Sequence, residues 1–250
     1  MEIQQVNSLA QNAYLNILVY GGAGVGKTVL CATAGKPTLI ISLEKGLLSL
    51  ANAPAHVHAV EITTVEDMQE VYKMLAASLE AGERRYEWVA VDSITDYAEL
   101  VLAQELQRNP DGRAAYPLYA SRVFALIKAF QELDYHFIAT AKQSTVKDEY
   151  NGLILRGPSM PGKKVAPELP YRFDEVFAME VVDAEAADGT KKQRRALHTA
   201  RDLIYDAKDR SGRLDATEHP NLSYIESKIF DRQSEPTQSK PQTENVGVKK

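Results

Sequence analysis

The chain has 250 residues, of which 44% are hydrophobic and 25% charged, and its formal net charge is −5. This size allows one substantial hydrophobic core, so we expect a single main domain. The acidic balance excludes a globally basic nucleic-acid-binding protein, and any contact with DNA has to come from a local cluster of cations. The single cysteine, Cys31, excludes a disulfide framework, and we expect it to be buried on the first helix.

The chain shows no signal for a membrane or for secretion. Residues 1–13 are polar and mixed, and no apolar run approaches the roughly 18 residues that a membrane span needs. We therefore expect a cytoplasmic protein with no membrane partner. No internal repeat is visible along the chain.

Apolar runs alternate with stretches of helical spacing along the first part of the chain. The runs cover residues 15–20, 38–43, 58–62, 88–91 and 136–141. Helical spacing occurs in residues 65–79 and 121–133, and Thr64 precedes two carboxylates, which predicts a helix N-cap. Because the runs are continuous in apolar character, they predict strands of a mostly parallel sheet that helices flank on both faces.

In the second half of the chain, the alternation of apolar runs and helical stretches gives way to hairpin and strand signals. Residues 143–164 contain the hairpin signal Tyr-Asn-Gly at 150–152, and we interpret them as a long hairpin or mobile loop that projects from the sheet. Residues 175–182 and 196–199 predict two further strands, joined by a polar turn at 183–195. These two strands are expected to form an antiparallel extension of the sheet.

The last part of the chain predicts a short closing helix at residues 221–230. Beyond it, residues 233–250 carry almost no apolar side chains, a composition typical of disorder. The sequence therefore predicts an N-terminal extension (1–13), one α/β domain (14–230) and a disordered polar tail (231–250).

The most specific motif is the octapeptide GGAGVGKT at residues 21–28, which fits the phosphate-binding loop pattern G-x-x-x-x-G-K-[ST]. Glycines let backbone N–H groups curl around an anion, Lys27 would reach the β- and γ-phosphates, and Thr28 would ligate Mg²⁺. An ordinary glycine turn explains the glycines but not the Lys-Thr pair, so the motif predicts binding of ATP or GTP with Mg²⁺. The predicted nucleotide-binding residues are Gly21, Gly22, Ala23, Gly24, Val25, Gly26, Lys27, Thr28 and Val29.

A second chemical signal is the segment WVAVDS at residues 88–93, an apolar strand that ends in Asp92. An aspartate at the carboxyl end of such a strand binds Mg²⁺ directly or through water, as in the Walker B strand of P-loop proteins. Its spacing from Lys27, with a helix and a strand between, favours this role. The alternative is that Asp92 or Ser93 caps the helix that begins near Ile94.

Glu44 follows the strand that comes directly after the P-loop helix. A P-loop hydrolase needs a group that orients the attacking water near the γ-phosphate, and Glu44 is placed for that role. Many other P-loop families keep this acid directly after the Walker B aspartate, where this chain has Ser93, so the arrangement indicates the RecA-like branch. The alternative is a surface glutamate that pairs with Lys45 or another neighbour.

Together these features resemble RecA-type ATPases, and most of all the phage RecA-like single-strand annealing proteins. The likeness spans roughly residues 16–230 and includes IATAKQ at 138–143, MPGKK at 160–164, ELPYRFDE at 168–175 and AKDR at 207–210. It implies a RecA-like P-loop NTPase core with a C-terminal antiparallel extension, ATP as substrate, and a homo-oligomer, ring or filament, with nucleotide at its interfaces. It also implies single-stranded DNA as a partner, with a single-strand-binding protein as a further candidate, in the host cytoplasm if a phage encodes the chain.

The resemblance assigns further catalytic roles. Oligomeric RecA-like ATPases insert a basic finger into the neighbour's γ-phosphate site, and Lys208 with Arg210 matches it, since Lys-x-Arg in a strand points both cations the same way. The alternative is a solvated turn in which nearby aspartates pair with the two bases. Gln143, or Thr140 before it, matches the position of a γ-phosphate sensor; otherwise Gln143 caps its strand.

The candidate DNA-binding segment is the loop at residues 143–164, where cations and one aromatic suit a phosphate track with base stacking. Its proposed contact residues are Lys147, Tyr150, Arg156, Lys163 and Lys164. Arg113 and Tyr116, in a loop predicted at residues 109–117, are a second candidate. The alternative is that residues 147–149 and the pair Lys163 and Lys164 are only solvated loop charges.

Three functions from different classes remain open. The first is an ATP-dependent protein that binds single-stranded DNA in recombination, annealing or repair, with ATP hydrolysis stimulated by the single strand. The second is a small-molecule or nucleotide kinase, against which Glu44 and the pair Lys208 and Arg210 argue. The third is a regulatory ATPase or loader that acts on replication proteins without direct stimulation by DNA, a role with which the acidic net charge is compatible.

Overall fold

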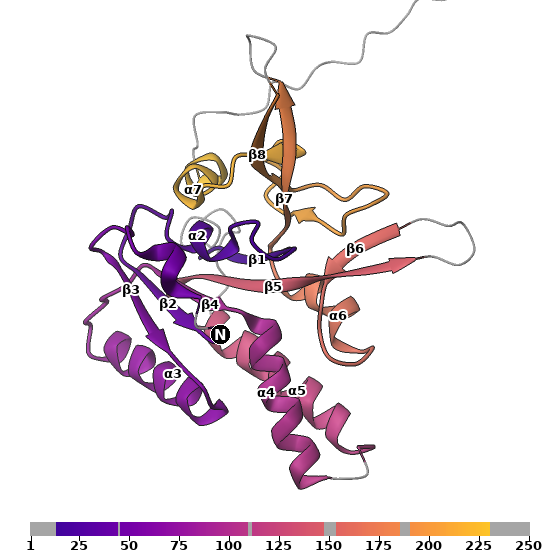
Figure 1. Cartoon of the computed structure of the whole chain (residues 1–250). Helices are drawn as coiled ribbons and strands as arrows, with labels where there is room; N and C mark the ends of the chain where they lie inside the picture. Colours follow the sequence, from indigo (N-terminus) through magenta and orange to yellow (C-terminus); the bar gives the residue numbers. More distant parts are fainter. Residues whose placement is uncertain (1–13, 45, 110–111, 148–153, 186–190, 231–250) are drawn as a thin grey trace, which may run out of the picture.

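The computed structural model describes residues 14–44, 46–109, 112–147, 154–185 and 191–230. Within these ranges the strands form one mixed sheet in the order β10-β8-β7-β1-β5-β4-β2-β3 (Figure 1). β6 (Ile154–Pro158) pairs with β5, β9 (Lys208–Asp209) pairs with β7, and the other end of the order is formed by β8 (Lys191–His198) and β10 (Thr217–Glu218). Its parallel part comprises β1 (Asn16–Gly21), β2 (Thr38–Ser42), β3 (Val57–Glu61), β4 (Trp88–Asp92), β5 (His136–Lys147) and β7 (Glu175–Glu185). The five strands predicted in the first half of the chain are confirmed, and the fifth runs on into the hairpin.

The strand order brings the predicted site residues to one edge of the sheet. β5 lies between β1, which leads into the phosphate loop, and β4, which ends in Asp92. Parallel pairing sets Gly21 level with Lys142 and Ser42 level with Asp92. The carboxyl ends of β1, β5, β4 and β2 therefore meet at the same edge, where ligands bind in open parallel sheets.

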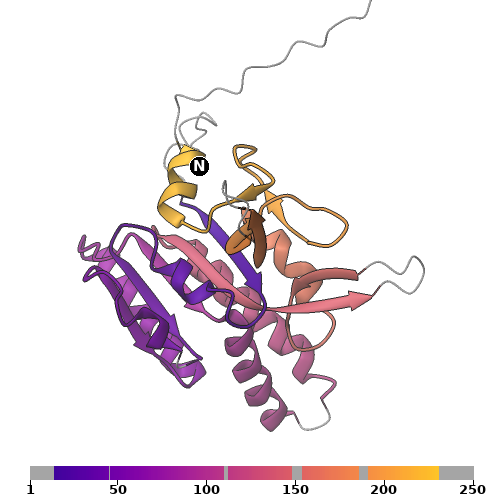
Figure 2. The same ribbon diagram turned by 45° about the horizontal axis from the view of Figure 1, so that its top comes forward.

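Helices cover both faces of the sheet (Figures 1 and 2). The first face carries α3 (Val65–Glu80), α4 (Ile94–Arg108) and α5 (Ala115–Gln131), and the second carries α2 (Lys27–Cys31) and α7 (Leu222–Phe230). Alternate residues of β1 divide the core into two clusters, since Leu18 and Tyr20 pack with the first face and Ile17 and Val19 with the second. This confirms the predicted fold class, a mostly parallel sheet with flanking helices.

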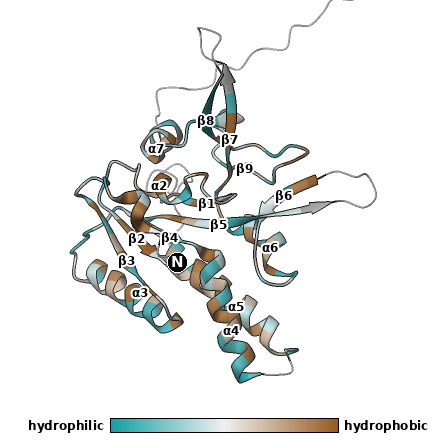
Figure 3. Cartoon of the chain, in the orientation of Figure 1, coloured by the Kyte–Doolittle hydropathy of each residue, from teal (hydrophilic) through white to brown (hydrophobic). Residues whose placement is uncertain are grey.

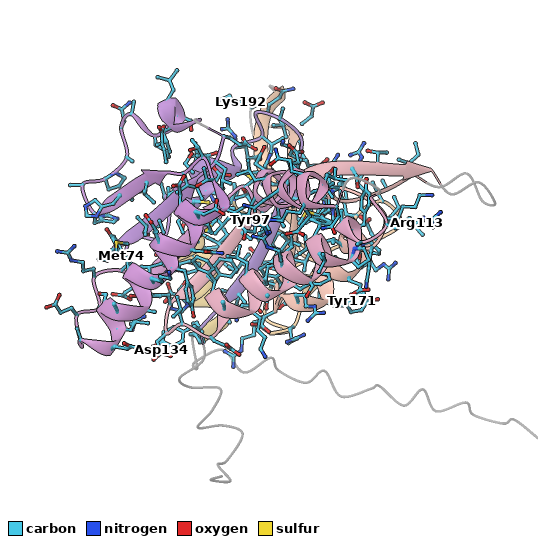
Figure 4. All side chains as sticks on the ribbon, turned by 90° about the horizontal axis from the view of Figure 1, so that it is seen from below. Met74, Tyr97, Arg113, Asp134, Tyr171 and Lys192 are labelled. Atoms are coloured by element: carbon cyan, nitrogen blue, oxygen red, sulfur yellow. The ribbon has the colours of Figure 1, made fainter. Side chains whose placement is uncertain are left out.

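The buried core consists mainly of apolar side chains from the strands and helices. Figure 3 shows that the helices are mixed in hydropathy, with hydrophobic and hydrophilic stretches on each. Tyr97 of α4 is buried, whereas Met74 and Arg113 lie at opposite sides of the molecule in Figure 4. Cys31 is fully buried in the second cluster, as predicted.

Two N-caps fix where the helices of the first face begin. The Thr64 hydroxyl accepts a hydrogen bond from the Asp67 N–H at 3.1 Å, and the Asp67 carboxylate accepts one from the Thr64 N–H at 2.9 Å. This capping box confirms the predicted start of α3. At α4 the capping residue is Ser93, whose hydroxyl accepts from the Asp96 N–H, so Asp92 is left free for other contacts.

The predicted hairpin within residues 143–164 is confirmed. Beyond its parallel part β5 pairs antiparallel with β6 (Ile154–Pro158), and the pair projects away from the sheet (Figure 2). The signal at residues 150–152 lies outside the described residues. The chain then forms α6 (Val165–Glu168) and the 3₁₀ helix η2 (Leu169–Arg172) before β7.

The polar turn predicted at residues 183–195 is wrong over most of its length. β7 runs to Glu185, and β8 (Lys191–His198) pairs with it antiparallel, with Asp183 opposite Gln193. Polar side chains were the signal for a turn, but a two-stranded ribbon open to water accepts polar residues within its strands. The antiparallel extension itself is confirmed, and β10 (Thr217–Glu218) extends it by pairing with β8.

The boundaries before α5 also differ from the prediction. The helix begins at Ala115, six residues before the predicted start, so the loop predicted at 109–117 is shorter and Tyr116 is helical. Pro117 marked a loop in the sequence, but a proline fits the first turn of a helix because the N–H groups there have no intrahelical partner. The short helix α7 at the end of the domain confirms the prediction there.

Two predicted terminal segments, 1–13 and 231–250, lie outside the described residues. Among the helices that the structure describes, none combines the length and the apolar character needed to cross a membrane.

Candidate active site

The phosphate loop lies between the end of β1 and the start of α2. Lys27 folds back across the loop, and its amine donates to the carbonyls of Gly21 and Gly22, both at 3.0 Å. Partial burial lowers the pKa of Lys27, while the carboxyls of Glu44 and Asp92 act in the opposite direction. The amine is therefore held at the centre of the loop, where it can exchange carbonyl oxygens for phosphate oxygens.

The loop needs a glycine where β1 ends. A Cβ on Gly21 would lie 2.4 Å from the carbonyl oxygen of Met179 on β7, far below any real contact of that kind. The backbone of the neighbouring strand therefore packs directly on the start of the loop. This close approach is a reason for the glycine that the motif alone does not reveal.

Asp92 joins the loop to the strand beside it. The Thr28 hydroxyl donates to Asp92 Oδ2 at 2.6 Å, and the Thr140 hydroxyl of β5 donates to Asp92 Oδ1. The aspartate is only 3% exposed, so these two hydroxyls orient a nearly buried carboxylate. Thr28 and Asp92, the two residues predicted to bind the metal, thus lie in direct contact.

The oxygen atoms of Thr28 and Asp92 fit Mg²⁺. This ion keeps several waters and is bound by one or two protein oxygens together with substrate phosphates, so it needs no cage of carboxylates. Accordingly, no cluster of three or more His, Cys, Asp or Glu residues that could hold a metal occurs in the described parts of the chain. The donor set matches a magnesium ion that enters with the nucleotide.

Glu44 lies at the same edge, next to Asp96 in the first turn of α4. Loss of water around the carboxyl raises the pKa of Glu44, and a hydrogen bond and charge repulsion from Asp96 raise it further. Partial burial by itself would raise the pKa of Asp96. Hydrogen bonds from Lys142 and Ser93 outweigh this effect, so the pKa of Asp96 lies below its ordinary value. Of the two carboxyls, Glu44 is therefore the one that holds a proton more readily. The open alternative, a pair with Lys45, involves a residue outside the described ranges.

Lys142 is a site residue that the sequence analysis did not single out. The side-chain amine of Lys142 lies 2.7 Å from Asp96 Oδ1 and 3.5 Å from Glu99 Oε1. The backbone N–H of Lys142 donates to the Thr95 hydroxyl at 3.0 Å. Its only sequence signal is its place at the end of β5, level with Gly21. Gln143, the predicted sensor, follows it and pairs with Pro158, so it stands where the hairpin begins.

The residues of the hairpin segment that were predicted to bind DNA differ in their exposure and contacts. Arg156 turns inward, because its guanidinium donates to the Tyr205 hydroxyl at 2.6 Å and lies 3.7 Å from Glu180 Oε2. Lys163 and Lys164 are exposed after β6. The side chains of Lys147 and Tyr150 lie outside the described residues.

Tyr116, from the second DNA candidate, lies close to the same segment. A Cβ on Gly162 would come within 3.0 Å of the Tyr116 ring, so the start of α5 and the loop after β6 are neighbours. Arg113 is exposed on that side of the molecule (Figure 4). The two candidate segments therefore belong to one surface.

The pair proposed as a finger lies at the opposite edge of the sheet from the phosphate loop. β9 (Lys208–Asp209) pairs with the start of β7, which is level with the start of β1. The Lys208 amine donates to the carbonyls of Pro170, at 2.8 Å, and Phe173, and Arg210 pairs with Asp174 at 2.6 Å. The structure does not bring these cations to the phosphate loop of the same chain, and a role at a neighbour's site stays a prediction.

Comparison with known proteins gives a family match and two distant structural likenesses. A family model described as an AAA domain (AAA_24) matches residues 13–211. No curated protein matches the chain. A KaiC-like protein from Pyrococcus horikoshii OT3 is similar at 14% identity over 78% of this chain and 81% of that one, with a TM-score of 0.42. An ATPase from the type III secretion system of pathogenic bacteria is similar at 17% identity over 71% of this chain but 56% of its own, with a TM-score of 0.47.

Proposed function

The chain belongs to the AAA domain family of P-loop ATPases, and from this premise we propose that it hydrolyses ATP with Mg²⁺ and couples hydrolysis to binding of single-stranded DNA. The observation that carries the proposal is the meeting of Lys27, Thr28, Asp92 and Glu44 at one edge of the sheet. These side chains supply a phosphate-binding cation, two metal ligands and a carboxyl for the attacking water, the groups that hydrolysis of a nucleoside triphosphate requires.

Each side chain has a separate task in this proposal. Lys27 binds the phosphates, and Thr28 and Asp92 hold Mg²⁺, which neutralises charge on the phosphate oxygens when it is bound. Glu44 orients the attacking water and accepts its proton. Burial and the neighbouring Asp96 raise the pKa of Glu44, and a general base has to be deprotonated, so we expect hydrolysis to fall at acid pH as Glu44 takes up a proton.

β5 supports the coupling to DNA. One strand carries Thr140 in contact with Asp92, Lys142 in contact with Asp96, and then the hairpin. The exposed Lys163 and Lys164 follow the hairpin and would contact the phosphates of the single-stranded DNA. A shift of the hairpin on binding DNA would therefore reach the nucleotide site through a single β-strand, and this route is what supports a role in recombination or annealing of the phage type.

We also propose that the chain acts as a homo-oligomer in the cytoplasm, with Arg210 of one subunit at the nucleotide of the next. Arg210 is 61% exposed, and its pair with Asp174 is a surface pair that a stronger partner can replace. Mixing inactive Lys27→Ala subunits with inactive Arg210→Ala subunits should restore part of the activity, because each mixed interface can combine an intact loop with an intact finger. No recovery would contradict action between subunits.

A second candidate function is a nucleotide-dependent loader that acts on replication proteins. The observation that favours it is the inward orientation of Arg156, which leaves fewer cations on the hairpin for DNA than the sequence indicates. Oligomers that form with ATP but do not respond to DNA would support this candidate.

The test is the steady-state rate of ATP hydrolysis with and without single-stranded DNA, with duplex DNA and Lys27→Ala as controls. We expect marked stimulation by the single strand and none in the Lys27→Ala variant. The double variant Lys163→Ala and Lys164→Ala should lose most of the stimulation, whereas Lys192→Ala, which removes an exposed lysine from β8, should keep it. Hydrolysis that ignores DNA would exclude the first candidate and leave the loader.

A further inference from the structure

Arg195 lies on β8, in the part of the chain where the sequence predicted a turn. Side chains alternate along this strand, so Arg195 is on the same face as Leu197, which is buried against α2 in the second core cluster. Arg195 precedes Leu197 by two residues, is exposed, and lies opposite Val181 of β7. The strand therefore presents this arginine beside the start of α2, where the phosphate loop is.

The arginine and the loop are in direct contact. Arg195 Nε donates to the carbonyl oxygen of Val25 at 2.8 Å. The next residue, Gly26, has a φ of +107°, and a Cβ there would lie 2.9 Å from Arg195 Nε and 3.1 Å from its Cδ. The backbone conformation of Gly26 favours glycine, and the absence of a side chain there leaves the space that the arginine occupies.

The positive charge of Arg195 has no counterion in the part of the chain that the structure describes. No carboxylate there forms an ion pair with it, and its hydrogen bond to Val25 uses one of the five N–H groups of a guanidinium. A neutral donor would serve Val25 equally well. A permanently charged, planar group beside a phosphate loop is suited to phosphate oxygens, which it can bind with two parallel hydrogen bonds.

We propose that Arg195 is a nucleotide-binding residue of the same chain, whose guanidinium contacts the phosphates of the nucleotide held in the P-loop. This inference rests on the proposed nucleotide site. It is separate from the finger, because Arg195 reaches the loop from within its own chain and needs no neighbour. It also gives the β7–β8 ribbon a function, since the ribbon carries the arginine and fixes its position against Val25.

The test is the affinity for MgATP and for inorganic tripolyphosphate, measured by calorimetry. Arg195→Gln keeps a donor for Val25 but removes the charge, and we expect both dissociation constants to rise roughly tenfold. Arg195→Lys should recover part of the loss. The matched control is Arg194→Gln, one residue along on the other face of the strand, which should bind both ligands as the unchanged protein does. Melting temperatures of all variants confirm folding.

Several outcomes would overturn the proposal. If Arg195→Gln weakened ATP but not tripolyphosphate, the arginine would contact the base and not the phosphates. If it weakened neither while Lys27→Ala lost ATP binding, Arg195 would only support the loop and the nucleotide site would stand. If the unchanged protein bound no ATP, the proposed function itself would fail. Recovery of hydrolysis on mixing Arg195→Gln with Lys27→Ala subunits would contradict action within one chain, in contrast to the recovery expected for Arg210.

Discussion

Two lysines at opposite edges of the sheet make the same kind of contact with different consequences. Lys27 donates to the carbonyls of Gly21 and Gly22, and Lys208 donates to those of Pro170 and Phe173. Burial lowers the pKa of both amines. The contact alone therefore does not distinguish a residue that binds a ligand from one that holds the chain together.

The surroundings of the two lysines make the distinction. Lys27 is hydrogen-bonded to its own loop and lies near Glu44 and Asp92, which accepts a hydrogen bond from Thr28, so its neighbours are the groups that we propose bind a phosphate and a metal. Lys208 instead joins β9 to η2 and the residue that follows it, since its amine bonds the carbonyls of Pro170 and Phe173. Asp209, the next residue of β9, lies opposite the buried Glu175 of β7. At one edge of the sheet the lysine lies among the groups proposed to bind a ligand, and at the other it holds two segments of its own chain together.

The largest effect that would sharpen this comparison is expected from Glu44→Gln. The amide cannot accept a proton, so we expect hydrolysis to slow by about 10²- to 10⁴-fold while ATP still binds. Single-turnover hydrolysis and calorimetric binding measure the two quantities separately. An unaltered rate would move the role of base to another residue, with Asp96 as the next candidate.

At the opposite edge, Glu175→Gln should change the stability of the fold in a pH-dependent way. Burial, with the charge of Asp209 second, raises the pKa of Glu175 from 4.5 to about 8. A carboxyl whose pKa rises on folding contributes its full stability below pH 4.5 and loses it as the pH rises through 8.

Urea unfolding at pH 5 and pH 9 measures this loss. The unchanged protein should lose up to about 4 kcal/mol more than the Glu175→Gln variant between the two pH values. The amide keeps a donor for Asp209 and an acceptor for the Ser211 N–H, so the variant should fold. Equal losses in the two proteins would show that Glu175 does not titrate in this range.

Lys208→Met should destabilise the fold by about 1–3 kcal/mol, since it leaves two carbonyls without their donor. Arg210→Ala, two residues away, removes only an exposed pair and should cost less than about 1 kcal/mol. Chemical unfolding of both variants at one pH tests the difference. If Arg210→Ala were the more destabilising of the two, the division of roles at this edge would be wrong.

The smallest effect concerns the influence of Asp96 on the pKa of Glu44. Asp96→Asn removes a neighbouring negative charge, so the pKa of Glu44 should fall towards its ordinary value. The acid limb of the hydrolysis rate should then move to lower pH. Glu99→Gln, at the other contact of Lys142, is the matched control and should leave the limb in place. A limb that moves to higher pH in Asp96→Asn would contradict the arrangement.

The sequence predicted the parts of this molecule that short segments determine. The signals for the loop at residues 21–28, for the strand that ends in Asp92 and for the acid Glu44 are each contained in a few consecutive residues. The capping box at Thr64 has the same local origin. These features could be read without a structure because their chemistry depends on spacing along the chain.

Other features depend on contacts between distant segments. Arg195 and Val25 are separated by 170 residues, and Lys142 and Asp96 by 46. The inward turn of Arg156 depends on Tyr205, which follows it by 49 residues. A basic residue in a loop looks the same in the sequence whether it faces water, DNA or a carboxylate of its own chain.

Binding of MgATP to the unchanged protein and to Lys27→Ala, measured by calorimetry at the same protein concentration, tests the central assignment most directly. We expect one ATP bound per chain, dependence on Mg²⁺, and a loss of most of this binding in Lys27→Ala with an unchanged melting temperature. Equal binding by the two proteins would contradict the assignment of residues 21–28 as the nucleotide site.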